Sequence, residues 1–261
     1  MTTTSPEPRY ARYPSLEGQV AFLSGGATGL GMEFVEQLAA QGVRVAFVDI
    51  DVEAGEALVA RVADRGHPKP TFIPCDVRDV PALQQAIRST SETLGPITIL
   101  VNNAADDTRR RVEDIDLAAW DDAMAVNLRH HFFAAQAVLP MMQAAGRGSI
   151  INLGSISAHI DLTDLPGYIT AKAGIEGLTR TLAREFGPSG IRVNCLIPGW
   201  VMTERQLTHW VTPEAEAAIE RNQCLPHKLY PEDVARMLLW LAADDSRSCT
   251  AQCWIVDGGW M

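Results

Sequence analysis

The sequence has no CxxC pair, no apolar run long enough to cross a bilayer, and fewer basic than acidic residues. Its five cysteines, Cys75, Cys195, Cys224, Cys249 and Cys253, are scattered and odd in number. This pattern argues against a disulfide framework or a zinc site and favours a reducing cytoplasm. The formal net charge of −10 argues against sequence-independent binding to nucleic acid or to an anionic membrane. We therefore predict a cytoplasmic protein without a metal, nucleic-acid or membrane partner.

Targeting and linker features are also scarce. Residues 1–17 carry Pro6, Pro8 and Pro14 but no apolar core of signal-peptide length, so we interpret them as a short, partly mobile arm. No internal repeat, low-complexity tract or linker divides residues 1–261, and 47% of the residues are hydrophobic. A chain of this kind has enough apolar material for one substantial core, which predicts a single domain.

Short apolar, β-branched runs alternate along the chain with longer segments of helical period. The runs are Val20–Ser24, Val43–Asp49, Thr71–Cys75, Ile97–Asn102, Ser149–Leu153, Ile191–Ile197 and Cys253–Val256. The helical segments are Gly29–Gln41, Val52–Arg65, Pro81–Leu94, Leu117–Gln143, Gly167–Phe186 and Pro231–Ala242. Near-continuous apolar strands separated by helices are typical of a parallel sheet covered on both faces. The fold class is therefore α/β, a single-domain, Rossmann-type, doubly wound parallel sheet of about seven strands.

One stretch, residues 200–229, breaks this alternation. It follows Pro198-Gly199 and contains Trp200, Met202, Trp210 and Pro213. We interpret it as a helical excursion over the sheet edge at which substrates bind, because long excursions of this kind are often mobile lids.

A glycine-rich segment joins the first strand to the first helix. Gly25, Gly29 and Gly31 lie where the turn is tight and where the backbone must approach a pyrophosphate closely. Exposed amides at the start of the helix then face the phosphates. The second strand ends at Asp49, at the separation where an acidic residue meets the adenosine ribose. Its charge would repel a 2′-phosphate, so NAD is favoured over NADP. The alternative is that Asp49 only caps the following helix.

A phenol, an ammonium and a hydroxyl are spaced for proton transfer. Tyr168 and Lys172 lie one helical turn apart and therefore share a face. A nearby ammonium can supply the roughly 4 kcal/mol that would bring a tyrosine pKa close to about 7. Ser155 follows an apolar strand, at the edge where α/β sheets bind ligands. Asn127 lies within a helical segment and could hold a water that links Lys172 to solvent. The alternative is an amphipathic helix with an exposed Lys and an interfacial Tyr.

These residues match a known pattern, and from Val20 to Gly259 the chain resembles the short-chain dehydrogenase/reductase family. The matching segments are Ser24–Gly31, Cys75-Asp76-Val77, Val101-Asn-Asn-Ala104, Asn127, Ser155, Tyr168-x-x-x-Lys172, and Pro198-Gly199 with Thr203. The resemblance implies a catalytic tetrad of Asn127, Ser155, Tyr168 and Lys172, with Tyr168 as acid and base. It also implies homotetramers or dimers built through the two long helices. Ser24 stands where the family usually has Thr, and Ala105 where it usually has Gly.

The resemblance implies a cofactor set as well. Asp76 and Val77 would contact adenine, Asn103 would pack on the adenosine side, and Lys172 would bind the nicotinamide ribose, with Val201 and Thr203 on the carboxamide. The full set of expected NAD contacts is Gly25, Thr28, Gly29, Leu30, Asp49, Ile50, Asp76, Val77, Asn103, Tyr168, Lys172, Pro198, Val201 and Thr203.

Within the family, several segments are similar to the bacterial NAD-dependent aldose 1-dehydrogenases, the D-xylose 1-dehydrogenases in particular. They include Tyr13–Leu16, Val126–His130, Gly154–Ser157 with His159, Ala171–Gly177, Gln223–Leu225 and Trp254–Trp260. This likeness implies oxidation of an aldose at C1 to its lactone, with Tyr168 as base. The alternative substrates are a sugar acid or another small polar secondary alcohol, as in L-arabinose or L-fucose oxidation. A non-catalytic NAD-binding protein would have no need of the tetrad.

Charged and aromatic residues near the expected site suit a polyol, whose hydroxyls take hydrogen bonds while its C–H face rests on an indole. The predicted substrate contacts are Ser155, Tyr168, Asp106, Arg109, His159 and Trp200. The alternative for Asp106 to Arg111 is a solvated surface loop. His130 and His131 could suggest a metal, but neighbours on a helix are expected to point to different faces, so no metal site is predicted.

Overall fold

The computed structural model describes residues 10–261, and part of the predicted arm, residues 1–9, lies outside the described residues. Its centre is one parallel seven-stranded sheet in the order β3-β2-β1-β4-β5-β6-β7. The strands are β1 Val20–Ser24, β2 Arg44–Asp49, β3 Thr71–Pro74, β4 Ile99–Asn102, β5 Gly148–Leu153, β6 Ile191–Pro198 and β7 Cys253–Val256. The order reverses between β1 and β4, which is where doubly wound sheets open a ligand crevice at their carboxyl edge.

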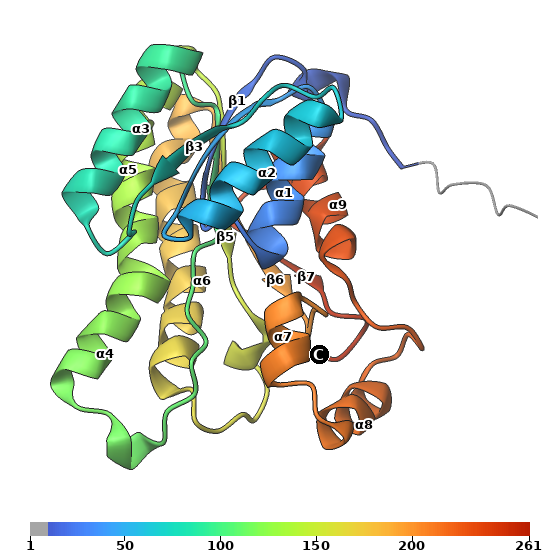
Figure 1. Cartoon of the computed structure of the whole chain (residues 1–261). Coiled ribbons are helices and arrows are strands. Elements are labelled where there is room, and N and C mark those ends of the chain that lie inside the picture. Colours follow the sequence, from blue (N-terminus) through green and yellow to red (C-terminus); the bar gives the residue numbers. More distant parts are fainter. Residues whose placement is uncertain (1–9) are drawn as a thin grey trace, which may run out of the picture.

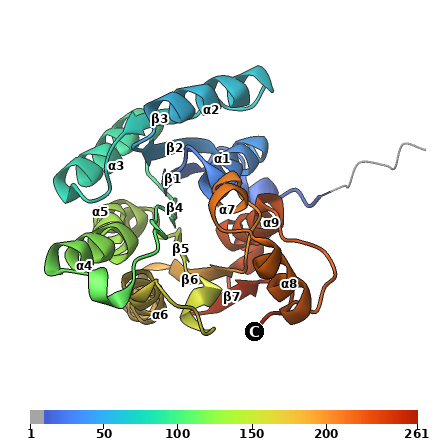
Figure 2. The same cartoon turned by 60° about the horizontal axis from the view of Figure 1, so that its bottom comes forward.

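Helices cover both faces of the sheet (Figures 1 and 2). The α-helices outside residues 200–229 are α1 Gly29–Ala40, α2 Val52–Asp64, α3 Val80–Leu94, α4 Leu117–Met124, α5 His130–Ala145, α6 Pro166–Phe186 and α9 Pro231–Ala242. One core packs α1, α2 and α9 on one face, around residues such as Leu38 and Leu238. The other face packs α3, α5 and the C-terminal end of α6, around residues such as Ile87 and Val138. The predicted fold class is confirmed.

The apolar runs gave the strand bounds to within a residue or two, and Val20–Ser24, Cys253–Val256 and Pro231–Ala242 match as predicted. The predicted single helix Leu117–Gln143 is wrong in one respect. A π-helical turn, Ala125–Arg129, separates α4 from α5. The cause is Asn127, whose side-chain Nδ2 donates to the carbonyl of Ala123, the acceptor that an α-helix reserves for the Asn127 backbone (3.0 Å).

The described part of the N-terminal arm packs against the domain. Leu16 is fully buried in the core of α1 and α9. The backbone N–H of Tyr13 donates to Oε1 of Gln41 (2.9 Å), and that of Asp244 donates to Oγ of Ser15 (3.1 Å). A buried leucine and these two bonds therefore hold residues 13–16 of the arm against the domain.

Residues 200–229 leave the sheet and return to the same place. An isolated parallel bridge pairs Val201 with Leu229, and the Met202 N–H donates to the Leu229 carbonyl (2.8 Å). Between these ends lie α7 Glu204–His209 and α8 Pro213–Asn222, below the carboxyl edge of the sheet in Figure 1. The segment is therefore helical, as predicted. Within residues 10–261, no helix combines the length and apolarity that a membrane crossing requires.

Candidate active site

The glycine-rich turn after β1 is a tight, backbone-lined cradle. Gly25 has a φ of +68°, and a Cβ there would lie 2.7 Å from the Cα of Ala104. A Cβ on Gly31 would lie 1.8 Å from the Gly25 carbonyl oxygen. Asn103 holds the turn from the β4 side, because its Nδ2 donates to the same oxygen (2.7 Å). Only glycine fits these two positions, and the cradle leaves the start of α1 open for an anion.

Ser24 provides a hydroxyl at the position where the resemblance leads us to expect Thr. Its Oγ accepts the backbone N–H groups of Asn103 (3.0 Å) and Ala104 (3.2 Å), which fastens β4 to the cradle. At the other end of the turn, Thr28 caps α1 without a side-chain hydrogen bond. The first amides of α1 are therefore left to a ligand.

Asp49 ends β2 beside the cradle. One carboxylate oxygen accepts the Ala27 N–H (2.8 Å) and the other the Asp51 N–H (3.1 Å). The cap of α2 is Asp51, which accepts the Ala54 N–H, so Asp49 does not have the capping role that the sequence left open. Two backbone donors fix the carboxylate and leave it further acceptor capacity for ribose hydroxyls.

These features open into one cleft of about 1400 Å³ along the carboxyl edge of the sheet. Most of the predicted site residues line it. On the cofactor side they are Gly25, Thr28, Gly29, Leu30, Asp49, Ile50, Asp76, Val77, Asn103, Pro198, Val201 and Thr203. On the substrate side they are Asp106, Arg109, Ser155, Tyr168 and Trp200. Asn127, His159 and Lys172 do not line it.

The adenosine half of the cleft combines apolar and charged residues. Asp76 pairs with Arg78, whose guanidinium lowers the carboxyl pKa below its usual range. Val77 is buried, and Ile50 is 70% exposed at the edge of the cleft. Across from the cradle, Thr203 caps α7 by accepting the Gln206 N–H (3.3 Å). Its methyl faces Gly29, so the β6 loop and the glycine turn form opposite walls.

Ser155, Tyr168 and Lys172 come together from β5 and α6. Ser155 follows β5 and accepts from the N–H (3.2 Å) and the hydroxyl (2.9 Å) of Ser157. The Lys172 Nζ lies 5.4 Å from the centroid of the Tyr168 ring and donates to the Leu153 carbonyl (2.8 Å). Tyr168 lines the cleft, whereas Lys172 is only 2% exposed behind it. The predicted exposed-lysine alternative is therefore wrong.

Burial at this centre opposes ionisation of both the phenol and the ammonium. Burial raises the pKa of the Tyr168 phenol, and the carboxylate of Asp107 raises it further, against a polar interaction with Ser155. Burial lowers the pKa of the Lys172 ammonium to about 8. The predicted fall of the phenol pKa rests on the ammonium together with the positive nicotinamide ring, and the protein groups alone raise this pKa. Desolvation of a phenolate outweighs an ammonium that is bonded to a carbonyl and itself desolvated.

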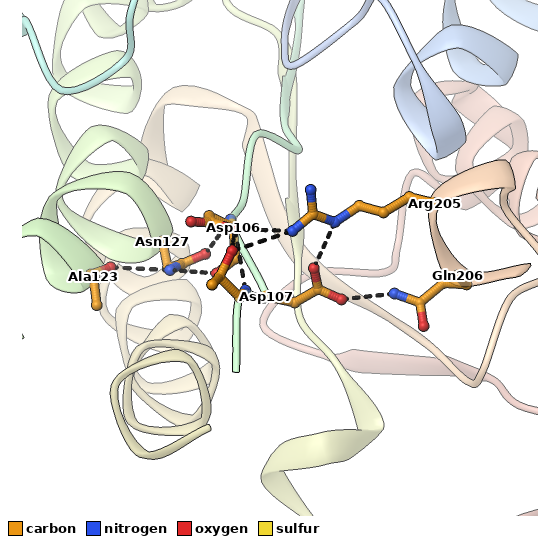
Figure 3. Close-up of polar contacts among 7 residues, drawn as sticks. Asp106, Asp107, Ala123, Asn127, Arg205 and Gln206 are labelled. Atoms are coloured by element: carbon orange, nitrogen blue, oxygen red, sulfur yellow. Dashed lines mark hydrogen bonds and ion pairs between the residues drawn. The ribbon is translucent and has the colours of Figure 1, made fainter. Parts of the chain in front are cut away.

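Asn127 fixes the loop that follows β4. Its Oδ1 accepts the Asp106 N–H (2.9 Å), and its Nδ2 donates to the Asp106 carbonyl (3.1 Å) and to that of Ala123. Figure 3 shows this amide turned onto the loop backbone. These bonds do not test whether Asn127 also holds a water that links Lys172 to solvent, which stays a prediction. The amide groups engage protein partners, so Asn127 positions Asp106 and its neighbour.

A set of charged bonds spans the cleft from this loop to α7 (Figure 3). The Arg205 guanidinium donates to Asp106 (3.1 Å) and to Asp107 (2.9 Å), and Gln206 Nε2 donates to Asp107 (2.6 Å). The sequence analysis missed Arg205 and Gln206, which lie about a hundred residues beyond their partners. No local pattern marks such a pair, because only the return of residues 200–229 over the sheet edge brings it together.

Of the other predicted substrate contacts, Arg109 and Trp200 line the cleft and His159 does not. The guanidinium carbon of Arg109 lies 4.5 Å from the Trp210 ring centroid, and Trp200 stacks on Trp260 with 6.3 Å between centroids. His159 instead pairs with Glu176 of α6 (2.5 Å) and does not line the cleft, so its contact with a substrate stays a prediction.

His130 and His131 differ from their expected arrangement. Both are fully buried, and their ring centroids are 4.4 Å apart rather than on different faces, because they begin α5 directly after the π turn. His130 contacts the Ala104 carbonyl (3.0 Å), and burial lowers its pKa to about 3. Among residues 10–261, no group of three potential metal ligands occurs. All five cysteines are free thiols.

The cleft fits a nicotinamide dinucleotide by its own features. A cradle that a Cβ would fill, open helix amides and a fixed acidic side chain lie at one end. A hydroxyl, a phenol and a buried ammonium lie at the other. Such an arrangement can bind a dinucleotide along the sheet edge and hold a reacting hydroxyl beside Tyr168.

Comparison with known proteins agrees with this geometry. The sequence model of a family described as enoyl-(acyl carrier protein) reductase matches residues 25–261. The D-xylose 1-dehydrogenase of Caulobacter vibrioides is 46% identical over 96% of this chain and 98% of its own length. The "Probable galactose dehydrogenase GalD" of Rhizobium meliloti is 44% identical over 95% and 97%. The crystal structure of a metagenomic blue fluorescent protein with NADPH has a TM-score of 0.85 at 32% identity, covering 94% of this chain and 99% of that one.

Proposed function

Because this chain belongs to the short-chain dehydrogenase/reductase family of oxidoreductases, we propose that it oxidises an aldose at C1 to the lactone with NAD. The observation that carries the proposal is the shared cleft, in which Ser155 and Tyr168 face the same space as the dinucleotide cradle. Identities of 46% to a D-xylose 1-dehydrogenase and 44% to a protein named a probable galactose dehydrogenase support an aldose as the substrate.

Each residue of the centre has a separate task. Ser155 orients the anomeric hydroxyl, and Tyr168 takes its proton. Lys172, buried and bonded to Leu153, holds a positive charge behind the phenol, and the family resemblance gives it the ribose of the dinucleotide as a further partner. A bound NAD would supply the hydride acceptor and a positive ring beside Tyr168. Trp200 offers an apolar face to the C–H side of the sugar, and Arg109 contributes charge at the rim.

NAD is the proposed cofactor because Asp49 presents a fixed carboxylate at the end of β2. Both of its oxygens are held by backbone amides, so it cannot turn away from a 2′-phosphate without breaking those bonds. The metagenomic blue fluorescent protein, a solved structure of the same fold, holds NADPH, so the fold alone does not choose the nucleotide and the choice of NAD rests on Asp49.

We also propose a homotetramer, assembled through α4, α5 and α6. Leu117 (76% exposed), Trp120 (37%) and Phe132 (42%) present apolar surface on α4 and α5. Large exposed apolar side chains of this kind mark interaction surfaces. The five free thiols suit a reducing compartment, and we propose the cytoplasm.

The test is NADH formation by the purified protein with D-xylose, D-galactose, D-glucose, L-arabinose and L-fucose, with NAD and NADP compared. We expect turnover of at least one aldose and preference for NAD. In Tyr168→Phe we expect kcat to fall by about 10²- to 10⁴-fold while NADH binding persists. Turnover of sugar acids or simple secondary alcohols without any aldose would overturn the substrate. Near-normal turnover by Tyr168→Phe would overturn the role of the phenol.

A further inference from the structure

The loop after β4 carries two neighbouring carboxylates, Asp106 and Asp107, which differ in the hydrogen bonds that they accept. Asp106 Oδ1 accepts from the N–H (3.1 Å) and hydroxyl (2.7 Å) of Thr108 and from Arg205 (3.1 Å). Its backbone is fixed at both N–H and C=O by Asn127. All three donors go to Oδ1, and no hydrogen bond of the described residues reaches Oδ2, so the Asp106 carboxylate is anchored through one oxygen alone. Asp106 is therefore engaged in holding its own loop.

Asp107 is arranged otherwise. Its Oδ1 accepts from Arg205 Nε (2.9 Å) and its Oδ2 from Gln206 Nε2 (2.6 Å), one donor on each oxygen. A carboxylate has about four acceptor sites, so each oxygen keeps one free. The side chain is 23% exposed, against 45% for that of Asp106. Two bonds from α7 hold this carboxylate in one orientation at the edge of the cleft (Figure 3).

The orientation brings Asp107 close to the reacting centre. It lines the same cleft as Ser155 and Tyr168. Its charge acts on both Tyr168 and Lys172 and raises the pKa of each. The charged groups around the phenol are thus Lys172 from its own helix and Asp107 from the β4 loop. Arg205 of α7 faces Asp107, and the β5 side contributes the uncharged Ser155.

We propose that Asp107 is the carboxylate that accepts hydrogen bonds from the sugar hydroxyls, and that Arg205 and Gln206 are positioning residues that aim it. The inference rests on the aldose oxidation proposed above. One free acceptor on each oxygen matches a pair of adjacent hydroxyls, as in an aldose. Asp107 thus takes the place of Asp106 as the expected sugar contact. Residues 200–229, which carry Arg205 and Gln206, then serve to orient the carboxylate that binds the sugar.

The decisive comparison is Asp107→Asn against Asp106→Asn, with Asp114→Asn as the control carboxylate. Asp114 lies exposed in the same loop and away from the cleft lining. The assay is steady-state kinetics of the full chain with the aldose that wild type oxidises fastest. For Asp107→Asn we expect the aldose KM to rise about 10- to 100-fold, with a smaller fall in kcat and an unchanged NADH Kd. Asp106→Asn should raise KM far less.

The pH profile separates this role from simple support of the loop. Removing the Asp107 charge lowers the pKa of the phenol, so the acid limb of kcat/KM should move to lower pH in Asp107→Asn. Arg205→Gln leaves Asp107 uncompensated and should move that limb to higher pH. Arg205→Lys keeps the positive charge but loses the paired N–H donors of the guanidinium. The acid limb of kcat/KM should therefore return to the wild-type pH, while the aldose KM stays raised.

Each outcome has one meaning. If wild type oxidises an aldose but Asp107→Asn keeps its KM and its acid limb, the inference is overturned and the proposed function stands. A larger KM effect in Asp106→Asn overturns it equally. If wild type oxidises no aldose, both fail. Should Asp107→Asn not fold, Gln206→Leu decides, because it spares the carboxylate: a raised KM with normal NADH binding supports the inference, and an unchanged KM overturns it.

Discussion

Replacing the buried lysine by methionine should stabilise the cofactor-free protein near neutral pH. Lys172 is 2% exposed, and burial lowers its pKa from 10.5 to about 8. At about 1.4 kcal/mol per pH unit, that fall corresponds to about 3 kcal/mol of free energy opposing the folded ammonium. Methionine has a similar length and no charge, so Lys172→Met removes this cost.

A lost hydrogen bond opposes the gain. The Lys172 Nζ donates to the Leu153 carbonyl (2.8 Å), and leaving that carbonyl unpaired costs about 1 kcal/mol. The net stabilisation of Lys172→Met near neutral pH is therefore about 2 kcal/mol. Because the folded pKa lies below the unfolded one, wild type binds fewer protons when folded and gains stability as pH rises from about 8 to 10.5. The advantage of the variant is complete below about pH 8 and reverses to a deficit of about 1 kcal/mol near pH 10.5.

Urea unfolding at about pH 7 and at about pH 10 measures both values. Lys69→Met is the control, because Lys69 is exposed, and its free energy of unfolding should change little at either pH. Lys172→Met should also lose nearly all dehydrogenase activity, which is the trade-off expected of a destabilised functional residue. The reasoning is refuted if Lys172→Met is less stable than wild type at about pH 7, or if its stability difference is the same at both pH values.

Three further changes test the cradle and its supports. In Asp49→Asn the ratio of kcat/KM for NAD over NADP should fall about 10- to 100-fold, and an unchanged ratio would contradict the assigned role. Gly31→Ala puts a Cβ 1.8 Å from the Gly25 carbonyl oxygen, so NADH binding measured by fluorescence should weaken more than about tenfold. Gly177→Ala, with nothing within 4 Å, should bind NADH normally, and equal effects of the two would be contrary to the cradle. Asn127→Ala leaves three backbone groups without their side-chain partner, so the free energy of unfolding in urea should fall by about 2–3 kcal/mol. A fall of less than about 0.5 kcal/mol would contradict the role of Asn127 in the π turn.

The sheet and the dinucleotide end were predictable because their signals are local. Apolar β-branched runs mark buried parallel strands whatever the rest of the chain does, and Val20–Ser24 is an example. Gly25 and Gly31 carry steric demands of their own turn. Family motifs then extended the prediction to the residues that line the cofactor side of the cleft.

What the sequence could not reveal depends on contacts made across the fold. The π turn arises because Asn127 finds Asp106, which lies on another element, and an isolated helical period does not show this. Arg205 meets Asp107 only after residues 200–229 return over the sheet edge. The Tyr168 pKa depends on burial, which spacing along a helix cannot supply. Long-range pairing and desolvation are properties of the assembled fold.

The most direct test of the central claim is to follow the hydride. Purified protein and NAD are mixed with the preferred aldose carrying deuterium at C1, and the NADH and sugar products are analysed by mass spectrometry and NMR. The account predicts that the label passes to the nicotinamide and that the sugar becomes the lactone or the aldonate formed from it by hydrolysis. Unlabelled NADH, formed with the deuterium still at C1, would place the oxidation at another carbon and contradict the account.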